Sequence, residues 1–262
     1  LEHNGDLFFL GDAGKLYRRS GIWAVEGTDG ESNPGLGLGK LYDTGDTATY
    51  IYFASGANVG RYEPSGDVYD DDWLTAVKGD SIDSDTKYHP MKLWGDTLYI
   101  GAGRYIASMT EGATWTKRAL TLPASVRVKS LAVIGNLLAI GTTEVPNSYN
   151  WIPRESPVFF WDGVSASFNN MITVNESYLD ALYSDENVLY AFAHTRGGVI
   201  YVYTGARFEI LRHMPNPGQD LQVFYAGGID RHRDGIMFAM THNDTDGEIK
   251  SGIWSLGRKR TA

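Results

Sequence analysis

The strongest constraint on the fold of this 262-residue chain is a short sequence pattern that recurs six times. Each copy opens with a turn, continues into a strand of apolar residues, and is followed by a second strand. The clearest copy, GDTLYIGAGRYIASMTEG, starts at Gly95, and the others start near positions 5, 48, 135, 186 and 234. The copies are therefore about 40 to 51 residues apart, and recurrence at such a period indicates a repeat architecture.

Each repeat has room for four short strands. Alternation of apolar and polar residues marks the strands, while Gly, Asn and Asp mark the joints between them. Four strands per repeat predict an all-β fold, a β-propeller with six four-stranded blades. We expect a single propeller domain over residues 1–262, and we expect it to be part of a longer chain because the sequence begins at Leu1 rather than Met. The alternative is a β-sandwich, which also contains many short strands.

The two terminal repeats are shorter than the others. Residues 1–4 leave little room for a lead-in strand, and we expect no outer strand after Ser255. Pairing of strands from the two termini would close the ring and remove an open edge. Sequence outside residues 1–262 is the other possible source of the missing strands.

The residue content excludes several classes of function. The chain has no cysteine, which excludes disulfides, thiolate catalysis and cysteine-bound zinc. Its formal net charge of −9 argues against nucleic acid as a partner, because such binding relies on Lys and Arg to neutralise phosphates. No apolar run reaches the roughly 18–20 residues that cross a bilayer, so we expect no membrane insertion.

Three insertions separate the repeats, at residues 27–39, 67–87 and 142–157. Loops on a rigid scaffold are common binding positions, although many are only tolerated insertions. The glycine-rich segment at 35–39, GLGLG, lacks the Lys-Ser/Thr of a phosphate-binding loop. We therefore interpret it as a plain loop.

Calcium is the one cofactor that the sequence leaves open. Oxygen ligands could come from Asp70-Asp71-Asp72 or from Asp80, Asp83 and Asp85, but neither group has the Gly and distal Glu of a helix-loop-helix calcium loop. The segment 243–248, NDTDGE, alternates carboxylates before a glycine. Asp-Gly is also a favoured hairpin pair, so polar turns are the simpler interpretation. We expect no other cofactor.

No set of residues identifies a reaction. A sialidase needs an arginine cluster and a tyrosine with an acidic partner, and other glycosidases need two facing carboxylates. With 32 Asp and Glu residues, carboxylate pairs arise by chance. We predict no catalytic residue and favour a non-enzymatic role, while leaving catalysis open.

One turn has a recognisable pattern. The segment from Ser108 to Trp115, SMTEGATW, resembles the Asp-box of sialidase-type propellers, S-x-D-x-G-x-T-W. It matches at Ser108, Gly112, Thr114 and Trp115, whereas Thr110 stands in place of the aspartate. In that family the box is a structural hairpin with the tryptophan packed between sheets. The resemblance therefore implies a propeller blade with a structural turn and no catalytic role for these residues.

Several predicted strands end in similar sequence segments: YRRSG, FFWDGVSASF, YVYTGARFE and GIWSLGRK. These resemble propeller domains of tailed-phage virion proteins, such as tail nozzles and fibres. The resemblance implies a structural or binding module in a virion assembled in the host cytoplasm, with other protein subunits as partners in an oligomeric assembly. A carbohydrate-active propeller is the alternative, either an extracellular lectin-like binder of cell-surface glycan or a sialidase-like hydrolase. A scaffold of the WD-repeat or kelch type lacks its dipeptide signatures here. Host, partner identity, copy number and glycan specificity stay open.

Overall fold

The computed structural model describes most of the chain, and every regular element in the described part is a β-strand. The described residues are 2–3, 6–10, 15–28, 36–39, 50–55, 58–74, 89–110, 114–145, 155–195, 197–214, 224–232, 235–243 and 249–257. Within these ranges no helix is long and apolar enough to cross a membrane. The chain divides into two compact units, Leu1–Val128 and Lys129–Ala262, and each is treated by itself.

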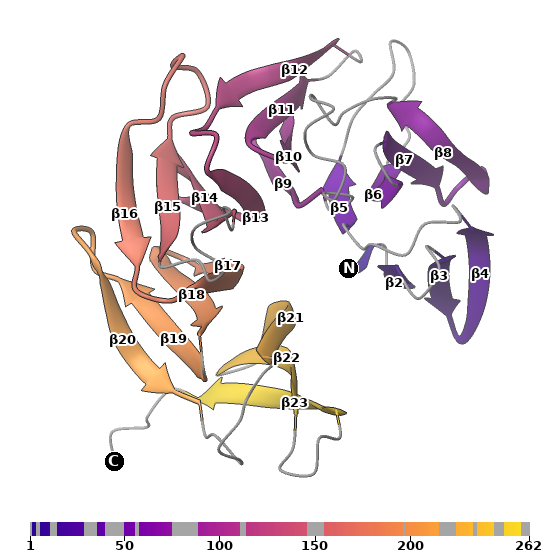
Figure 1. Ribbon diagram of the computed structural model, residues 1–262. Helices are drawn as coiled ribbons and strands as arrows, with labels where there is room; N and C mark the ends of the chain where they lie inside the picture. Colours follow the sequence, from indigo (N-terminus) through magenta and orange to yellow (C-terminus); the bar gives the residue numbers. More distant parts are fainter. Residues whose placement is uncertain are drawn as a thin grey trace. The chain divides into compact units, whose positions relative to one another are not determined.

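The first unit contains three antiparallel four-stranded sheets, each built from consecutive strands (Figure 1). In chain order its strands are β1 (Glu2–His3), β2 (Asp6–Leu10), β3 (Lys15–Ser20), β4 (Ile22–Thr28), β5 (Leu36–Gly39), β6 (Tyr50–Ser55), β7 (Asn58–Glu63), β8 (Val68–Leu74), β9 (Met91–Trp94), β10 (Thr97–Ala102), β11 (Tyr105–Thr110) and β12 (Thr114–Thr121). The sheets are β1–β4, β5–β8 and β9–β12. Three repeats of the sequence thus give three sheets.

Two expectations for this unit were wrong. The segment predicted as a loop at 35–39 contains β5, whose residues Leu36 to Gly39 pair with β6. Glycine weakens a strand but does not prevent one, and pairing with the buried strand β6 supplies the missing stability. The first repeat also has a lead-in strand, because the two-residue β1 pairs with Asp6 and Leu7 of β2.

The second unit contains two four-stranded sheets and one of three described strands. Its strands are β13 (Val126–Ile134), which contains the boundary between the units, β14 (Leu137–Glu144), β15 (Ser156–Trp161), β16 (Asn170–Val174), β17 (Tyr178–Asp185), β18 (Val188–His194), β19 (Gly198–Tyr203), β20 (Phe208–His213), β21 (Phe224–His232), β22 (Gly235–Asn243) and β23 (Ile249–Gly257). The last sheet, β21–β23, has no fourth strand within the described ranges.

In three of the repeats the opening turn is within the described residues, and there it has a left-handed backbone. Gly95 and Gly135 have φ of +58° and +55°, and Glu186 occupies the equivalent position in its repeat with φ of +56°. Glycine enters this region freely, whereas a residue with a Cβ is strained there. The recurrent glycine therefore reflects a backbone requirement that Glu186 meets at a cost.

Both faces of a sheet are buried in the first unit. On β6, the side chains of Tyr50 and Tyr52 belong to the core shared with the sheet β9–β12. The intervening residues Ile51 and Phe53 belong to the core shared with the sheet β1–β4. Successive strand residues point to opposite faces, so this alternation places the middle sheet between two neighbours.

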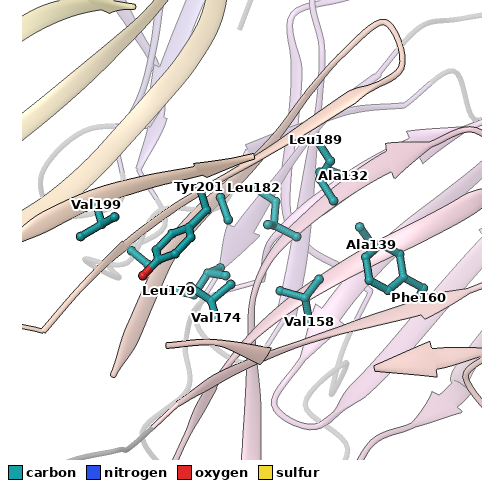
Figure 2. Close-up of a cluster of buried hydrophobic side chains, with 12 residues drawn as sticks. Ala132, Ala139, Val158, Phe160, Val174, Leu179, Leu182, Leu189, Val199 and Tyr201 are labelled. Atoms are coloured by element: carbon teal, nitrogen blue, oxygen red, sulfur yellow. The ribbon is translucent and has the colours of Figure 1, made fainter. Parts of the chain in front are cut away.

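The second unit is organised in the same way. One core joins the sheets β13–β16 and β17–β20 (Figure 2). Leu179 and Leu182 of β17 approach Gly141 of β14 closely, and a Cβ added to Gly141 would lie 2.6 Å from Leu179 Cδ2. The fifth residue of β18, equivalent to Gly141, is Phe192, whose ring packs 5.1 Å from that of Phe238 in β22. The side chain at this strand position therefore differs in volume between one sheet interface and the next.

Candidate functional site

Most of the exposed apolar side chains lie on the last strand of a sheet in chain order, here called its outer strand. In the first unit these are Ile22 and Val25 on β4 and Val68 on β8. In the second unit they are Met171 on β16 and the adjacent pair Ile210 and Leu211 on β20, which are 53% and 46% exposed. Six of the eight large apolar residues found exposed in the described ranges thus lie on outer strands.

Four of the outer strands are bulged. In β4 the pairing with β3 skips Glu26, and in β20 the pairing with β19 skips Leu211. Longer irregularities interrupt β8 between Asp70 and Leu74 and β12 between Thr116 and Leu120. Bulges twist an edge strand and limit uncontrolled pairing with other chains.

β20 is the most exposed of these strands. Phe208 is half-buried, but every residue from Glu209 to His213 is exposed. The strand ends the sheet β17–β20 and pairs on one edge with β19. An exposed ion pair joins the start of this strand to the residue before it: Arg207 Nη2 lies 2.8 Å from Glu209 Oε1.

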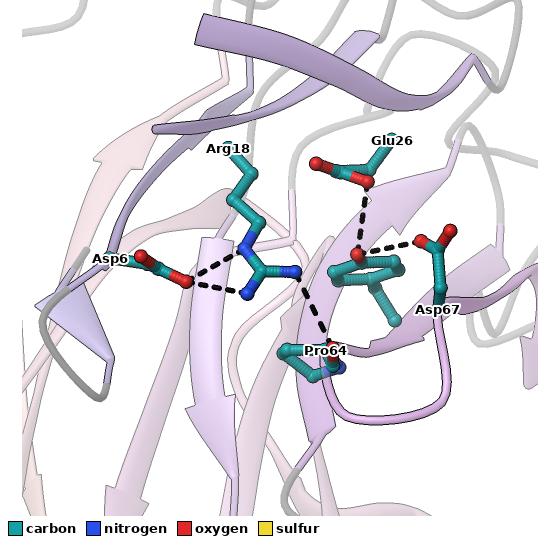
Figure 3. Close-up of polar contacts among 6 residues, drawn as sticks. Asp6, Arg18, Glu26, Pro64 and Asp67 are labelled. Atoms are coloured by element: carbon teal, nitrogen blue, oxygen red, sulfur yellow. Dashed lines mark hydrogen bonds and ion pairs between the residues drawn. The ribbon is translucent and has the colours of Figure 1, made fainter. Parts of the chain in front are cut away.

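A polar cluster joins two sheets of the first unit (Figure 3). Arg18 on β3 donates from Nε to Asp6 Oδ2 at 2.7 Å, and its Nη2 lies 2.6 Å from the same oxygen. Its Nη1 reaches the carbonyl of Pro64, in the turn between β7 and β8. The hydrogen bond to Asp6 raises the pKa of Arg18, so the guanidinium stays charged. Arg18 thereby links the first sheet to the second.

The second half of this cluster is centred on Tyr62, which is fully buried. Its hydroxyl lies 3.0 Å from Glu26 Oε2 and 2.9 Å from Asp67 Oδ1, so one proton serves two carboxylates. Burial, and then the hydrogen bond with Asp67, raise the pKa of Tyr62 well above its usual range. A phenol held neutral in this way is a hydrogen-bond donor and not a nucleophile. The bulge at Glu26 is what directs this carboxylate to the neighbouring sheet.

The second unit has a buried ionic group on β17 and its neighbours. Asp180 is skipped in the pairing of β17 with β18, and its Oδ2 lies 2.9 Å from His194 Nδ1. The ring of Tyr178 stacks on His194 with centroids 5.0 Å apart. Burial lowers the pKa of Lys129, and the charge of Asp180 opposes that shift. A His–Asp pair can orient a general base; here the pair joins the neighbouring strands β17 and β18.

Neither cluster was predicted from the sequence. The partners are far apart in the chain: Pro64 lies 46 positions after Arg18, and His194 lies 14 positions after Asp180. Two carboxylates of these clusters, Glu26 and Asp180, lie at bulges, which strand periodicity does not reveal. The one available signal is a charged residue inside an otherwise regular strand pattern.

The predicted turn motif lies on the hairpin from β11 to β12. Ser108 ends up opposite Thr116, and the Cα partner of Trp115 is Met109. Trp115 is half-buried against the core between the sheets β5–β8 and β9–β12. Thr114 starts β12, and Gly112 lies outside the described residues.

A different residue, Asp162, closes the hairpin between β15 and β16. Its Oδ1 accepts the backbone N–H groups of Val164 and Ser165, and its Oδ2 accepts the Ser165 hydroxyl at 2.6 Å. These hydrogen bonds hold the pKa of Asp162 far below its usual range. The Trp161-Asp162 pair is therefore part of a structural turn: Trp161 Nε1 donates to the Ser165 carbonyl.

The calcium candidates remain largely outside the described residues. This applies to Asp80, Asp83 and Asp85, and to segment 243–248 after Asn243. In the described part of β8, the Cα partner of Asp70 is Arg61. No group of three or more acidic or histidine side chains within the described ranges is arranged to hold a metal ion.

Comparison with solved structures identifies the architecture. The chain is similar to the WD40 β-propeller domain of Doa1, with a TM-score of 0.55 and 10% identity, over 96% of this chain and 79% of that one. It is similar to the WD40 repeats of RRP9, with a TM-score of 0.54 and 9% identity, over 87% and 67%. It is also similar to Saccharomyces cerevisiae Sqt1, with a TM-score of 0.52 and 10% identity, over 95% of this chain and 68% of that one.

The fold is a β-propeller. The prediction of an all-β propeller is confirmed at this level, in preference to the β-sandwich. No protein-family model and no curated protein matches the sequence. At identities near 10% the likeness concerns the fold alone.

Proposed function

We propose that this chain is a non-catalytic propeller that binds other protein subunits in a larger assembly. The observation that carries the proposal is the concentration of exposed apolar side chains on outer strands, seen at Ile22, Val68, Met171 and Ile210. Single exposed apolar residues are common on protein surfaces, but their concentration at sheet edges is typical of docking surfaces. The polar clusters around Arg18 and His194 are engaged in connecting strands and sheets.

The proposal includes one propeller of six blades over residues 1–262, within a longer chain. Six sheets, five of four strands and one of three, are present in the described ranges. The similarity to the Doa1 propeller domain extends over 96% of this chain and so includes residues of both units. Both facts support one continuous array of blades.

For the assembly, we propose a tailed-phage tail, with the chain located in the virion. The support is the resemblance of the strand-ending turns to phage propeller domains. Three of these turns have a glycine with positive φ in the structure, Gly21 at +92°, Gly163 at +81° and Gly205 at +93°. Extracellular glycan binding is the alternative.

We also infer that the hairpin from Ser108 to Trp115 is a structural turn of the Asp-box type. Trp115 contributes to the core between two sheets, and Lys117 Nζ lies 5.2 Å from its ring. Truncation of Trp115 to Ala is therefore expected to lower the thermal midpoint while binding at the outer strands is retained. A variant of unchanged stability would contradict the structural role.

We propose that the chain needs no cofactor, and calcium is the alternative. Addition of calcium, followed by removal with EDTA, should leave the thermal midpoint unchanged. A reversible rise of several degrees with calcium would instead favour a site in one of the acidic segments.

Photo-crosslinking tests the binding role. A photoreactive amino acid is placed at Ile22, Met171 or Ile210 in the full chain, and at Ser65 in the exposed β7–β8 turn as the matched control. The assembly that contains this chain is purified and its crosslinks are identified by mass spectrometry. Defined subunits should be crosslinked to the outer-strand positions and not to Ser65. Turnover of a glycoside panel, or binding only to a glycan array, would support the carbohydrate alternative and contradict this proposal.

A further inference from the structure

β20 differs from the other outer strands in its charge pattern. Its central residues, Glu209, Ile210, Leu211 and Arg212, place an acid and a base on either side of two exposed apolar residues. By contrast, β8 carries three aspartates and no base, and β12 carries a lysine and an arginine and no acid. β16 has no charged residue, and β4 has a single glutamate that contacts Tyr62.

This pattern is complementary to itself. If two copies of β20 run antiparallel about a two-fold axis between positions 210 and 211, Glu209 faces Arg212 of the other copy. The same axis places Ile210 opposite Leu211, so each interaction forms twice. Directly opposed residues in antiparallel strands lie close enough for such pairs to interact. A two-fold contact of this kind uses the same patch on both copies.

Other registers lack this match. In a parallel arrangement Glu209 faces Glu209 and Arg212 faces Arg212, which places like charges together. A shift of one residue toward the start of the strand sets Glu209 opposite Leu211 and Arg212 opposite Phe208. Opposite-charge pairs stabilise neighbouring strands and like-charge pairs destabilise them, so the two-fold register is the favourable one.

We propose that β20 pairs edge to edge with β20 of a second copy of this chain. The proposal rests on the binding role of the outer strands and adds the partner for one of them. Ile210 and Leu211, both about half exposed, would be covered by the contact. The exposed ion pair between Arg207 and Glu209 leaves the second carboxylate oxygen of Glu209 for Arg212 of the partner copy.

The bulge at Leu211 limits the contact to a short segment. A bulge bends its strand and increases the local twist, so long flat pairing along this edge is disfavoured. Because the two-fold contact occupies the same edge on both copies, it also closes on itself. The expected product is a dimer and not a fibre.

A charge-swap series tests the proposal. The full chain should be a dimer by sedimentation equilibrium, with dissociation favoured by salt. Glu209→Arg should weaken the dimer at least about tenfold, or about 1.4 kcal/mol, and Arg212→Glu should do the same. The double variant carrying both changes should restore the dimer. Circular dichroism checks that each variant is folded, which is expected because both side chains are exposed.

Two controls separate this contact from other effects. Arg207→Gln removes only the internal ion pair of Glu209, and Met171→Ser changes an exposed apolar residue on another outer strand; both should leave the dimer intact. A chain that is monomeric at all concentrations, or a dimer that neither single charge reversal weakens, would overturn the inference. A monomer that still links to other subunits from Ile22 would overturn it and leave the proposed binding role standing.

Discussion

Leu179 of β17 occupies the space that a side chain at Gly141 of β14 would need. A Cβ on Gly141 would lie 2.6 Å from Leu179 Cδ2 and 3.0 Å from Leu182 Cδ1. Real Cβ atoms do not approach other atoms so closely, so the glycine sets the distance between two sheets. This contact gives the first of four predictions.

Gly141→Ala should destabilise the protein by about 1–3 kcal/mol, because added volume in a packed core forces its neighbours to shift. Thermal or urea unfolding measures the change. Gly197→Ala is the matched control, since a Cβ there meets nothing within 4 Å. Equal effects of the two substitutions would show that backbone freedom, rather than close packing, is responsible.

Glu186→Gly should stabilise the protein by about 1 kcal/mol, because a residue with a Cβ in the left-handed region is strained by about that amount. The variant loses one of two carboxylates near Arg231 Nη1, but Asp185 Oδ1 remains at 3.0 Å. The thermal midpoint reports the gain. Gly135→Ala, at the equivalent position with φ of +55°, should shift the midpoint in the opposite direction. Glu186→Gly without any gain would mean that the turn is not strained.

Arg18→Lys should destabilise the protein by about 1–2 kcal/mol, because an ammonium group cannot replace a guanidinium that contacts two acceptors. Those acceptors, Asp6 and the Pro64 carbonyl, belong to different sheets of the first unit. Arg207→Lys, in an exposed ion pair, is the control and should change stability by no more than about 0.5 kcal/mol. A similar small effect at Arg18 would contradict its role in joining the sheets.

At alkaline pH the ionisation of Tyr201 should lower the stability of the protein. Burial, and then the charge of Glu176, raise the pKa of Tyr201 to about 12. A raised pKa means that the unfolded chain loses this proton first, so the stabilisation is present below about pH 10 and declines as the pH rises toward 12. The free energy of unfolding from urea titrations should fall by up to about 2–3 kcal/mol over this interval through this group.

Tyr201→Phe removes that decline. The difference in stability between the variant and the natural chain should be constant from pH 7 to about pH 9 and should narrow above pH 10. The constant part reports the lost hydrogen bond to Glu176, which is 3.3 Å long. A difference that stays constant up to pH 12 would contradict the raised pKa.

Sequence periodicity was sufficient for the architecture. The repeated turn at Gly95 and Gly135, followed by an apolar strand, is dictated by local backbone geometry, and the structure places a two-residue turn at both positions. The same local reasoning failed at 36–39, where two leucines between glycines form a strand because β6 offers a partner. Strand formation there is decided by pairing and not by propensity.

The polar clusters could not be predicted in the same way. Glu26 and Asp180 are directed by bulges, and a single inserted residue leaves almost no trace in an alternating pattern. The similarity to WD40 propellers could not be predicted from the sequence either, because their dipeptide signatures are absent from this chain. At 9–10% identity the arrangement of strands persists although the sequence pattern has changed.

The different volumes at the fifth position of β14 and β18 have a consequence for how the chain is ordered. Gly141 admits the leucines of β17, whereas Phe192 fills its interface with Phe238. Exchanging the segments that carry these strands would create a clash at one boundary and a void at the other. The sheets β13–β16 and β17–β20 therefore each fit the sheet that follows them, and the volume of one side chain in each helps to fix their order along the chain.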